Sequence, residues 1–337
     1  MYRFAKHVAS LCLVLFCLPC FAATAPPLPS SDNDVTDSVL QMLGNEQIVE
    51  LDQFLEQLNV SGSEGKNDDG RWKMNAYATG LEYYFCSEKA WKVYADYLDE
   101  LKKAKPKSPS VALAEASYWR CYAWDARGSG YSSSVTGPGW KLFKERLKRA
   151  EASLNETKSF AAAYPLWYTL QIQNASESNA DVAYLAALEK EALERHKYYY
   201  QTYIVIARSL TPKWGGSWES LDQFAVASTA GTRQVEGESM YARLYWAVDQ
   251  QYGTSLDIFK ETLIKWPKMK KGFEDLMQRY PKSKRNLNAF ASFACRAGDK
   301  ATFLKLQLQI GTEVVPSAWA SNYSMDLCQN IFKGKSV

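Results

Sequence analysis

Residues 290–304 of the chain read FASFACRAGDKATFL, and this stretch best predicts the fold. Phenylalanines alternate here with alanines, so one helix carries both large and small side chains on its apolar face. Small residues let neighbouring helices approach closely, and glycine commonly ends a helix. The stretch is therefore typical of a helical hairpin that packs against the next hairpin. The pattern is carried by Phe290, Ala291, Phe293, Ala294, Ala297, Gly298, Asp299, Ala301 and Leu304.

Similar patterns continue on both sides of this stretch. Apolar residues at helical spacing predict helix pairs at 160–174 with 181–193, 196–210 with 217–229, 236–251 with 255–266, 269–280 with 286–297, and 300–310 with 315–332. No alternating run is bounded by hairpin signals, so we expect at most minor sheet. The period is loose but typical of tetratricopeptide-like hairpins. We predict an all-α fold, an α-α superhelix of tetratricopeptide-like helical hairpins, with an irregular helical bundle as the alternative.

The first half of the chain predicts the same architecture with more aromatic residues. Leucine and valine at helical spacing predict two short helices before residue 60. The segment 61–70 holds three glycines and four charged residues, and we expect an exposed linker there. Helices are then predicted at 72–85, 91–98, 111–125 and 140–154. The expected organisation is a signal peptide at 1–25, a leader with short helices at 26–60, the linker at 61–70 and a helical-repeat domain at 71–332.

The N-terminus has the features of an export signal. Arg3 and Lys6 precede an apolar run at 8–21 that is too short to span a membrane, and small residues follow at 22–25. We therefore predict a periplasmic or secreted protein of the bacterial envelope. Lipidation at Cys20 is the alternative, which the preceding Pro19 disfavours.

After signal removal the chain is nearly neutral. The lost segment carries two positive charges and no acidic residue, so the formal net charge of +3 falls to about +1. Because this charge is too small for a general affinity for nucleic acid, no nucleic-acid partner is expected. The apolar segment 198–210 contains Gln201, Thr202 and Arg208, so no transmembrane segment is expected after signal removal.

Four of the seven cysteines remain after signal removal, an even number for an oxidising compartment. Cys86 and Cys121 are 35 residues apart, and Cys295 and Cys328 are 33 apart. Both separations are close to one helical-hairpin repeat of about 34 residues, which places each pair on equivalent faces of neighbouring helices. We predict a disulfide between Cys86 and Cys121 and another between Cys295 and Cys328. Four reduced, buried thiols are the alternative.

Histidine is nearly absent, which limits the chemistry available to the chain. His196 is the only histidine after the signal, and the charged residues Glu194, Arg195 and Lys197 around it indicate a helix surface. One histidine and four paired cysteines leave few ligands for zinc or copper. The sequence also has no Walker-type, dinucleotide-binding or calcium-loop motif. We therefore predict no catalytic residue, no metal site and no cofactor.

Two loops rich in tryptophan and glycine interrupt the helical pattern. Residues 119–140 read WRCYAWDARGSGYSSSVTGPGW, and residues 212–218 read PKWGGSW. The structural interpretation is that the first loop packs on its own aromatic residues and the second joins two helices. If the loops meet at one edge of the superhelix, their aromatic faces and cations would line a pocket for a sugar ring or a peptide carboxylate. The candidate binding residues are Trp124, Arg127, Tyr131, Trp140, Lys213, Trp214 and Trp218.

Several ordered motifs resemble those of one protein family. They are DGRWK at 69–73 leading to GL at 80–81, WRCYAWDARGSGY at 119–131, GWKLFKERL at 139–147, PKWGGSW at 212–218, NLN at 286–288, AC at 294–295 and AGD at 297–299. Through these motifs the chain resembles, from Ile48 to Leu304, a bacterial family described as domain of unknown function 4034. The resemblance implies a tetratricopeptide-like helical fold and carries no catalytic assignment.

We expect an exported helical-repeat protein that binds a protein, peptide or glycan partner without catalysis. The alternative is a glycan or cell-wall active enzyme with two carboxylates facing an aromatic groove. Asp125 and Glu219 are the candidates near the two loops, although Asp125 lies close to Arg127 in sequence and is more simply its salt-bridge partner. An effector or immunity-type role rests only on export and helical repeats.

Overall fold

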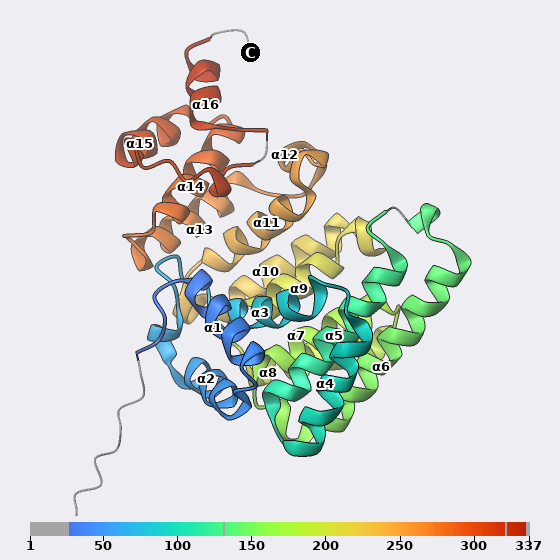
Figure 1. The fold of residues 1–337 in the computed structure, drawn as a ribbon. Coiled ribbons are helices and arrows are strands. Elements are labelled where there is room, and N and C mark those ends of the chain that lie inside the picture. The colour runs from blue at the N-terminus through green and yellow to red at the C-terminus, as the bar shows by residue number, and fades with distance from the viewer. Residues whose placement is uncertain (1–26, 131, 321, 335–337) are drawn as a thin grey trace, which may run out of the picture.

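The computed structural model describes residues 27–130, 132–320 and 322–334, and this part of the chain is built from α-helices (Figure 1). The predicted signal peptide at 1–25 lies outside the described residues. The helices of the first half are α1 (Asp32–Gly44), α2 (Ile48–Val60), α3 (Met74–Cys86), α4 (Trp91–Ala104), α5 (Pro109–Arg127), α6 (Gly137–Ala161), α7 (Pro165–Glu177) and α8 (Val182–Arg195). Those of the second half are α9 (Tyr200–Ser209), α10 (Trp218–Glu236), α11 (Ser239–Tyr252), α12 (Ile258–Glu261), α13 (Trp266–Arg279), α14 (Lys284–Arg296), α15 (Lys300–Ile310) and α16 (Met325–Phe332). Short 3₁₀ turns are η1 (Gly62–Gly65), η2 (Ser132–Ser134), η3 (Pro212–Trp214), η4 (Gly253–Ser255) and η5 (Pro316–Ala318).

The predicted all-α fold is confirmed. Across the described ranges, β-pairing is limited to one isolated bridge between Lys66 and Trp72. Many helices pack against the next helix or the next but one, as α5 does with α6 and α1 with α3, and Figure 1 shows α13 to α16 grouped at one end of the molecule. This packing is consistent with a superhelical arrangement. Within the same part of the chain, no helix is both long and apolar enough to cross a membrane.

The stretch at 290–304 forms the hairpin of α14 and α15. Phe290 and Phe293 are buried in the core, and Asp299 caps α15 by accepting a hydrogen bond from the Thr302 backbone N–H at 3.0 Å. Two apolar residues of the predicted pattern are placed differently, because Leu304 is 42 % exposed and Ala301 is exposed as well. Phe303, next to Leu304, is fully buried and packs against α16 instead.

Two predicted helices are much shorter than their apolar spacing indicated. The segment 255–266 contains only the single turn α12, because the backbone is extended at Thr262 and Lys265 before α13 begins at Trp266. Pro267 lies in the first turn of α13, where its missing N–H costs no helical hydrogen bond. The described residues of 315–332 are likewise helical only in η5 and α16, since Pro316 starts a 3₁₀ turn and Trp319 leaves it in an extended conformation.

In the described part of the molecule, two large hydrophobic cores share helix α9, and a third, small cluster of Ala123, Phe143 and Leu147 lies between α5 and α6. The first core is built from α1 to α9 and includes fully enclosed side chains such as Trp167. The second is built from α9 to α16 and includes Phe273. Successive residues of a helix point to different sides, so α9 directs Ile206 into the first core and Ala207 into the second. This shared helix couples the two halves of the chain.

The segment 61–70 is exposed at residues 62–64 and 68, as expected of a linker, but its C-terminal end is buried. Asp69 is only 1 % exposed. Its carbonyl oxygen accepts hydrogen bonds from Asn286 at 3.2 Å and Arg243 at 3.5 Å. Its carboxylate pairs with Arg71 at 2.6 Å and with Arg285 at 3.6 Å. We call residues 61–73 the strap, because the segment holds α11 and α14 of the second half against the first half.

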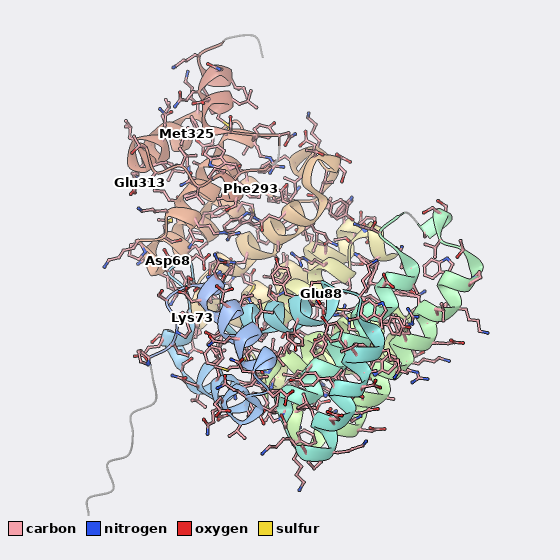
Figure 2. All side chains as sticks on the ribbon, viewed as in Figure 1. Asp68, Lys73, Glu88, Phe293, Glu313 and Met325 are labelled. Carbon is pink, nitrogen blue, oxygen red and sulfur yellow. A yellow bond between two sulfur atoms is a disulfide. The ribbon has the colours of Figure 1, made fainter. Side chains whose placement is uncertain are left out.

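Gly70 of the strap lies in close contact with two side chains of the second half. Gly70 adopts a φ of 81°, and a Cβ atom there would lie 2.4 Å from the Tyr280 ring and 2.5 Å from the Arg243 guanidinium. No other residue type fits this approach without displacing its neighbours. Figure 2 shows Asp68 and Lys73 of the strap at the junction between helices of the two halves.

A fully buried carboxylate lies beneath the strap. Glu236 is 0 % exposed and lies 3.9 Å from Lys66, 3.7 Å from Arg243 and 4.0 Å from Arg279, and it accepts a hydrogen bond from the Tyr200 hydroxyl. Because such a charge is costly to bury alone, these cations make its burial possible. We call the following residues the strap cluster: Asp69 and Glu236 with Lys66, Arg71, Arg243, Arg279 and Arg285.

The predicted cysteine pairing is confirmed. Cys86 of α3 is bonded to Cys121 of α5, and Cys295 of α14 to Cys328 of α16, with Cα atoms 5.3 and 5.9 Å apart. Each bridge joins helices about one hairpin apart, as the spacing predicted. Two disulfides fit an oxidising environment.

Candidate functional site

The first tryptophan loop lies at the end of the hairpin formed by α5 and α6. The Gly128 backbone N–H donates to the carbonyl oxygen of Trp124 at 2.8 Å and ends α5. Thr136 begins α6 by capping its first turn. This end of the hairpin therefore carries Trp124 and Arg127 on the last turn of α5 and Trp140 on the first turn of α6.

Arg127 makes its contacts within its own loop. Its guanidinium carbon lies 4.9 Å from the ring centroid of Trp124 and 5.3 Å from that of Trp140. It also donates hydrogen bonds to the carbonyl oxygens of Gly128 at 3.0 Å and Gly130 at 3.1 Å. These cation–π contacts and hydrogen bonds hold the loop against its two helices. The geometry is that of a loop packed on its own aromatic residues.

The second loop meets this hairpin end at Trp214. The rings of Trp124 and Trp214 are edge to face, with centroids 6.3 Å apart and an interplanar angle of 82°. The chain returns tightly after Trp214, since a Cβ atom at Gly216 would lie 2.0 Å from the Leu210 carbonyl oxygen. Ser217 then caps α10. The hypothesis that the two loops lie side by side is confirmed at this tryptophan pair.

The seven candidates do not form one pocket. Trp218 packs on Tyr252 with ring centroids 5.5 Å apart, and the Lys213 backbone N–H donates to the Tyr252 hydroxyl at 3.2 Å. These contacts fix the base of the second loop, and neither residue lines the cavity beside Trp214. The candidate Tyr131 lies outside the described residues.

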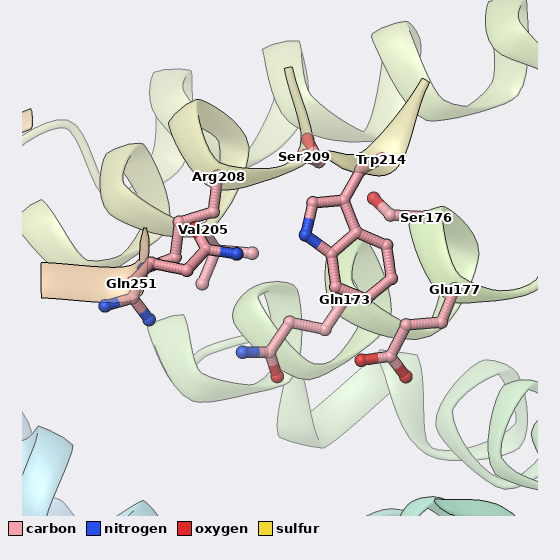
Figure 3. A pocket seen from close by; sticks show the side chains of 8 residues that line it. All are labelled: Gln173, Ser176, Glu177, Val205, Arg208, Ser209, Trp214 and Gln251. Carbon is pink, nitrogen blue, oxygen red and sulfur yellow. The ribbon is translucent and has the colours of Figure 1, made fainter. Parts of the chain in front are cut away.

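A cavity of about 180 Å³ lies beside the Trp214 ring (Figure 3). We call it the Trp214 pocket. The C-terminal ends of α7, α9 and α11 and the turn η3 build its walls. Figure 3 shows Arg208 and Gln251 on one side of the indole ring and Glu177 on the other. The lining residues are Gln173, Ser176, Glu177, Val205, Arg208, Ser209, Trp214 and Gln251.

Arg208 differs from the buried arginines Arg120 and Arg243, each of which pairs with a carboxylate. It forms no salt bridge with any acidic residue that the structure describes, and its buried Nε atom has no hydrogen-bond acceptor there. Burial lowers the pKa of its guanidinium below the ordinary value. Arginine nevertheless stays charged at neutral pH, so a positive charge faces this pocket with no carboxylate of the described residues paired to it.

Two acceptor atoms of the pocket also lack a partner. Glu177 binds Arg120 through Oε1 at 2.6 Å, but its Oε2 atom is buried and receives no hydrogen bond from the described residues. Oε1 of Gln251 is buried without a donor in the same way. Unpaired buried polar atoms are uncommon in folded proteins and each calls for an explanation. Three of them line this one small pocket.

A second cavity of about 470 Å³ lies on the far side of two residue pairs. The salt bridge between Arg120 and Glu177 and the pair of Trp124 and Trp214 form the shared wall, because each pair has one member lining each cavity. We call this cavity the disulfide cleft. Its lining residues are Glu82, Cys86, Lys89, Trp91, Ser117, Arg120, Cys121, Trp124, Asp125, Gly128 and Ser129.

Asp125 is not the salt-bridge partner of Arg127 that its position in sequence suggested. Its carboxylate pairs with Lys89 at 2.6 Å and accepts a hydrogen bond from the Trp91 indole at 3.2 Å. Lys89 reaches it because α3 and α5 are neighbours, whereas Arg127 turns towards its own loop. The other candidate carboxylate, Glu219, is exposed on the first turn of α10 and lines neither cavity.

The most informative pocket residue was not among the predicted candidates. In the sequence, Arg208 indicates only that the segment 198–210 does not span a membrane. A single charged residue near the end of an otherwise uncharged helix is the signal that could have identified it. Gln173, Glu177 and Gln251 carry no signal in sequence, since polar residues at helix ends are common.

Comparison with known proteins identifies no homologue of this chain. No protein-family model, no curated protein and no solved structure matches the chain. The resemblance to the family described as domain of unknown function 4034 therefore stays a prediction. The function must be argued from the site itself.

Proposed function

We propose that this protein is an exported helical-repeat protein that binds a small ligand in the Trp214 pocket and does no chemistry on it. The observation that carries the proposal is the unpaired Arg208 beside the Trp214 ring, which is 38 % exposed. An aromatic face with a few convergent polar groups is typical of a ligand site. The volume of about 180 Å³ is below the 300–1,000 Å³ usual for drug-sized molecules, so the ligand is small.

Binding without catalysis agrees with the acidic groups near the pocket. Glycoside hydrolysis needs two carboxylates across the bond to be cleaved. Of the residues that line the Trp214 pocket, Glu177 is the one carboxylate, and Arg120 holds one of its oxygens. Asp125 is held by Lys89 in the neighbouring cleft. These pairings favour the binding role over the glycan-active alternative.

Export to the periplasm or beyond is part of the proposal. The N-terminal segment has the charge and apolar pattern of a signal peptide, and both disulfides fit an oxidising compartment. A small-molecule binder at that location would meet nutrients, wall fragments or signals from outside the cell.

Ligand recovery tests the proposed function. The full chain is expressed with its own N-terminus, purified from the bacterial envelope without denaturant, then unfolded, and the released small molecules are identified by mass spectrometry. We expect one compound to be retained by the wild-type protein and to return unchanged after prolonged incubation. Trp214→Ala should lose it. Lys213→Ala is the matched control in the same turn and should keep it.

Two results would contradict the proposal. A compound that is converted to a product by the wild-type protein would indicate an enzyme. Equal recovery from the wild-type protein and Trp214→Ala, together with a less stable variant, would show that Trp214 only packs the interhelical joint.

A further inference from the structure

The unpaired atoms of the Trp214 pocket are of opposite kinds. Nε of Arg208 is a donor on a cation, whereas Oε2 of Glu177 is an acceptor on an anion and Oε1 of Gln251 is a neutral acceptor. Figure 3 shows Arg208 and Glu177 apart from each other, with the Trp214 ring between them. A ligand that satisfies all three atoms must bring both an acceptor and a donor into the pocket.

The donor side favours a carboxylate. Guanidinium is a planar fork whose two N–H groups match the two oxygens of a carboxylate. Arg208 is the one basic residue among those that line the pocket. Phosphate groups usually bind where several cations or a helix N-terminus converge, and neither arrangement is found here.

The acceptor side favours a positively charged donor. Arg120 lies 2.6 Å from Oε1 of Glu177 and leaves Oε2 without a donor, so that oxygen can accept from a second cation. The helices α7, α9 and α11 all end at the pocket. A helix C-terminus carries partial negative charge, so these three ends disfavour a purely anionic ligand and favour one with a compensating positive group.

Size and the aromatic wall limit the ligand further. A volume of about 180 Å³ has room for a single small molecule rather than a chain of sugars or residues. The exposed indole face of Trp214 and the buried Val205 offer an apolar surface beside the polar groups. An ammonium group placed over the indole face would gain a cation–π contact.

We infer that the ligand of the Trp214 pocket is a free α-amino acid, or a small zwitterion of the same kind. Its carboxylate binds Arg208, and its ammonium group binds Oε2 of Glu177 on the other side of the indole ring. Its side chain lies against Trp214 and Val205. The inference rests on the proposed function, because it names the ligand class of the same pocket.

Ligand derivatives test the inference on the unmodified protein. Each standard L-amino acid is added at millimolar concentration in a thermal-shift assay, and the strongest binder is measured by isothermal titration calorimetry. Its N-acetyl derivative lacks the ammonium group, and its α-amide lacks the carboxylate. We expect each derivative to bind about ten- to 100-fold more weakly, as befits the loss of one charged hydrogen-bonded group.

Two variants assign each end of the ligand to a residue. In Arg208→Met the amino acid and its amide should bind with equal affinity, because the group that recognises the carboxylate is gone. In Glu177→Gln the amino acid and its N-acetyl derivative should bind about equally. Circular dichroism and urea unfolding of both variants confirm that the pocket is still folded.

The outcomes separate this inference from the proposed function. Binding that is insensitive to N-acetylation would indicate an anion site, and binding that is insensitive to amidation would indicate a cation site; either would overturn the inference. If no amino acid binds but a neutral or singly charged compound is recovered in a Trp214-dependent way, the inference fails and the proposed function stands. If no amino acid binds and nothing is recovered, both fail.

Discussion

The strap cluster and the Trp214 pocket both bury arginine, but they treat its charge in opposite ways. In the strap cluster each cation lies within 4.0 Å of a carboxylate, either that of Asp69 or that of Glu236. In the Trp214 pocket Arg208 has no such partner among the described residues. Charges paired inside the protein hold the two halves together, whereas a charge left unpaired at a cavity is available to a ligand. Pairing therefore separates structural arginines from candidate binding arginines here.

Neutralising Glu236 should have the largest effect on stability. Glu236→Gln keeps the shape of the side chain but leaves Lys66, Arg243 and Arg279 without their shared anion. Removing one partner from a buried ionic group costs about 3–5 kcal/mol. We expect a loss of that size in the free energy of unfolding, measured by urea denaturation of the full chain.

A matched control for this variant lies on the same helix. Glu219→Gln changes an exposed glutamate of α10 and should leave the urea midpoint essentially unchanged. If Glu236→Gln proved as stable as this control, the ion pairs of the strap cluster would not hold the two halves together.

Breaking the salt bridge at the wall of the pocket should have the next largest effect. Arg120→Met removes the partner that lies 2.6 Å from Glu177 and 4.0 Å from Glu82. Because the Glu177 side chain keeps 11 % exposure, water can relieve part of the penalty. We expect a loss of about 2–3 kcal/mol in the free energy of unfolding. A loss below about 0.5 kcal/mol, the usual effect of a surface substitution, would show that this pair is not structural.

The two regions also show what sequence can and cannot predict. Apolar spacing predicts most helices, and the cysteine spacing predicts both disulfides, because these signals depend on contacts between neighbouring helices. The glycines and charges of 61–70 look like a solvated linker, since nothing local reveals that α11 and α14 surround Asp69. Trp214 stands out in sequence, whereas Arg208 becomes informative only when the structure shows that no acidic residue of the described chain pairs with it.

Filling the space at Gly70 should have an intermediate effect. Gly70→Ala puts a methyl group within 2.5 Å of the Tyr280 ring and the Arg243 guanidinium, at a φ of 81° that disfavours alanine. Strain and overpacking together should cost about 2–3 kcal/mol. Gly215→Ala is the matched control, because Gly215 also has a positive φ but has no atom within 4 Å of the added group. It should lose only about 1–2 kcal/mol. Both variants are measured by thermal and urea unfolding. If Gly70→Ala lost no more stability than Gly215→Ala, the strap would not be closely packed at Gly70.

The smallest effect on stability should come from Arg208→Met, which tests directly whether the unpaired arginine of the pocket stabilises the fold. The substitution removes a partly buried charge that no residue of the described chain balances, and methionine keeps much of the apolar stem. Replacing an uncompensated charge by an apolar side chain of similar length is often neutral or stabilising. With ligand removed by refolding, we expect a change of less than about 1 kcal/mol in the free energy of unfolding, of either sign.

Arg120→Met and Arg208→Met thus remove the same side chain from two sides of one small region. If both lost 2 kcal/mol or more, Arg208 would be structural as well, and the pocket would need another explanation for its unpaired atoms. If only Arg120→Met loses this much, Arg208 is not needed for the stability of the fold, and its charge is available to bind a carboxylate.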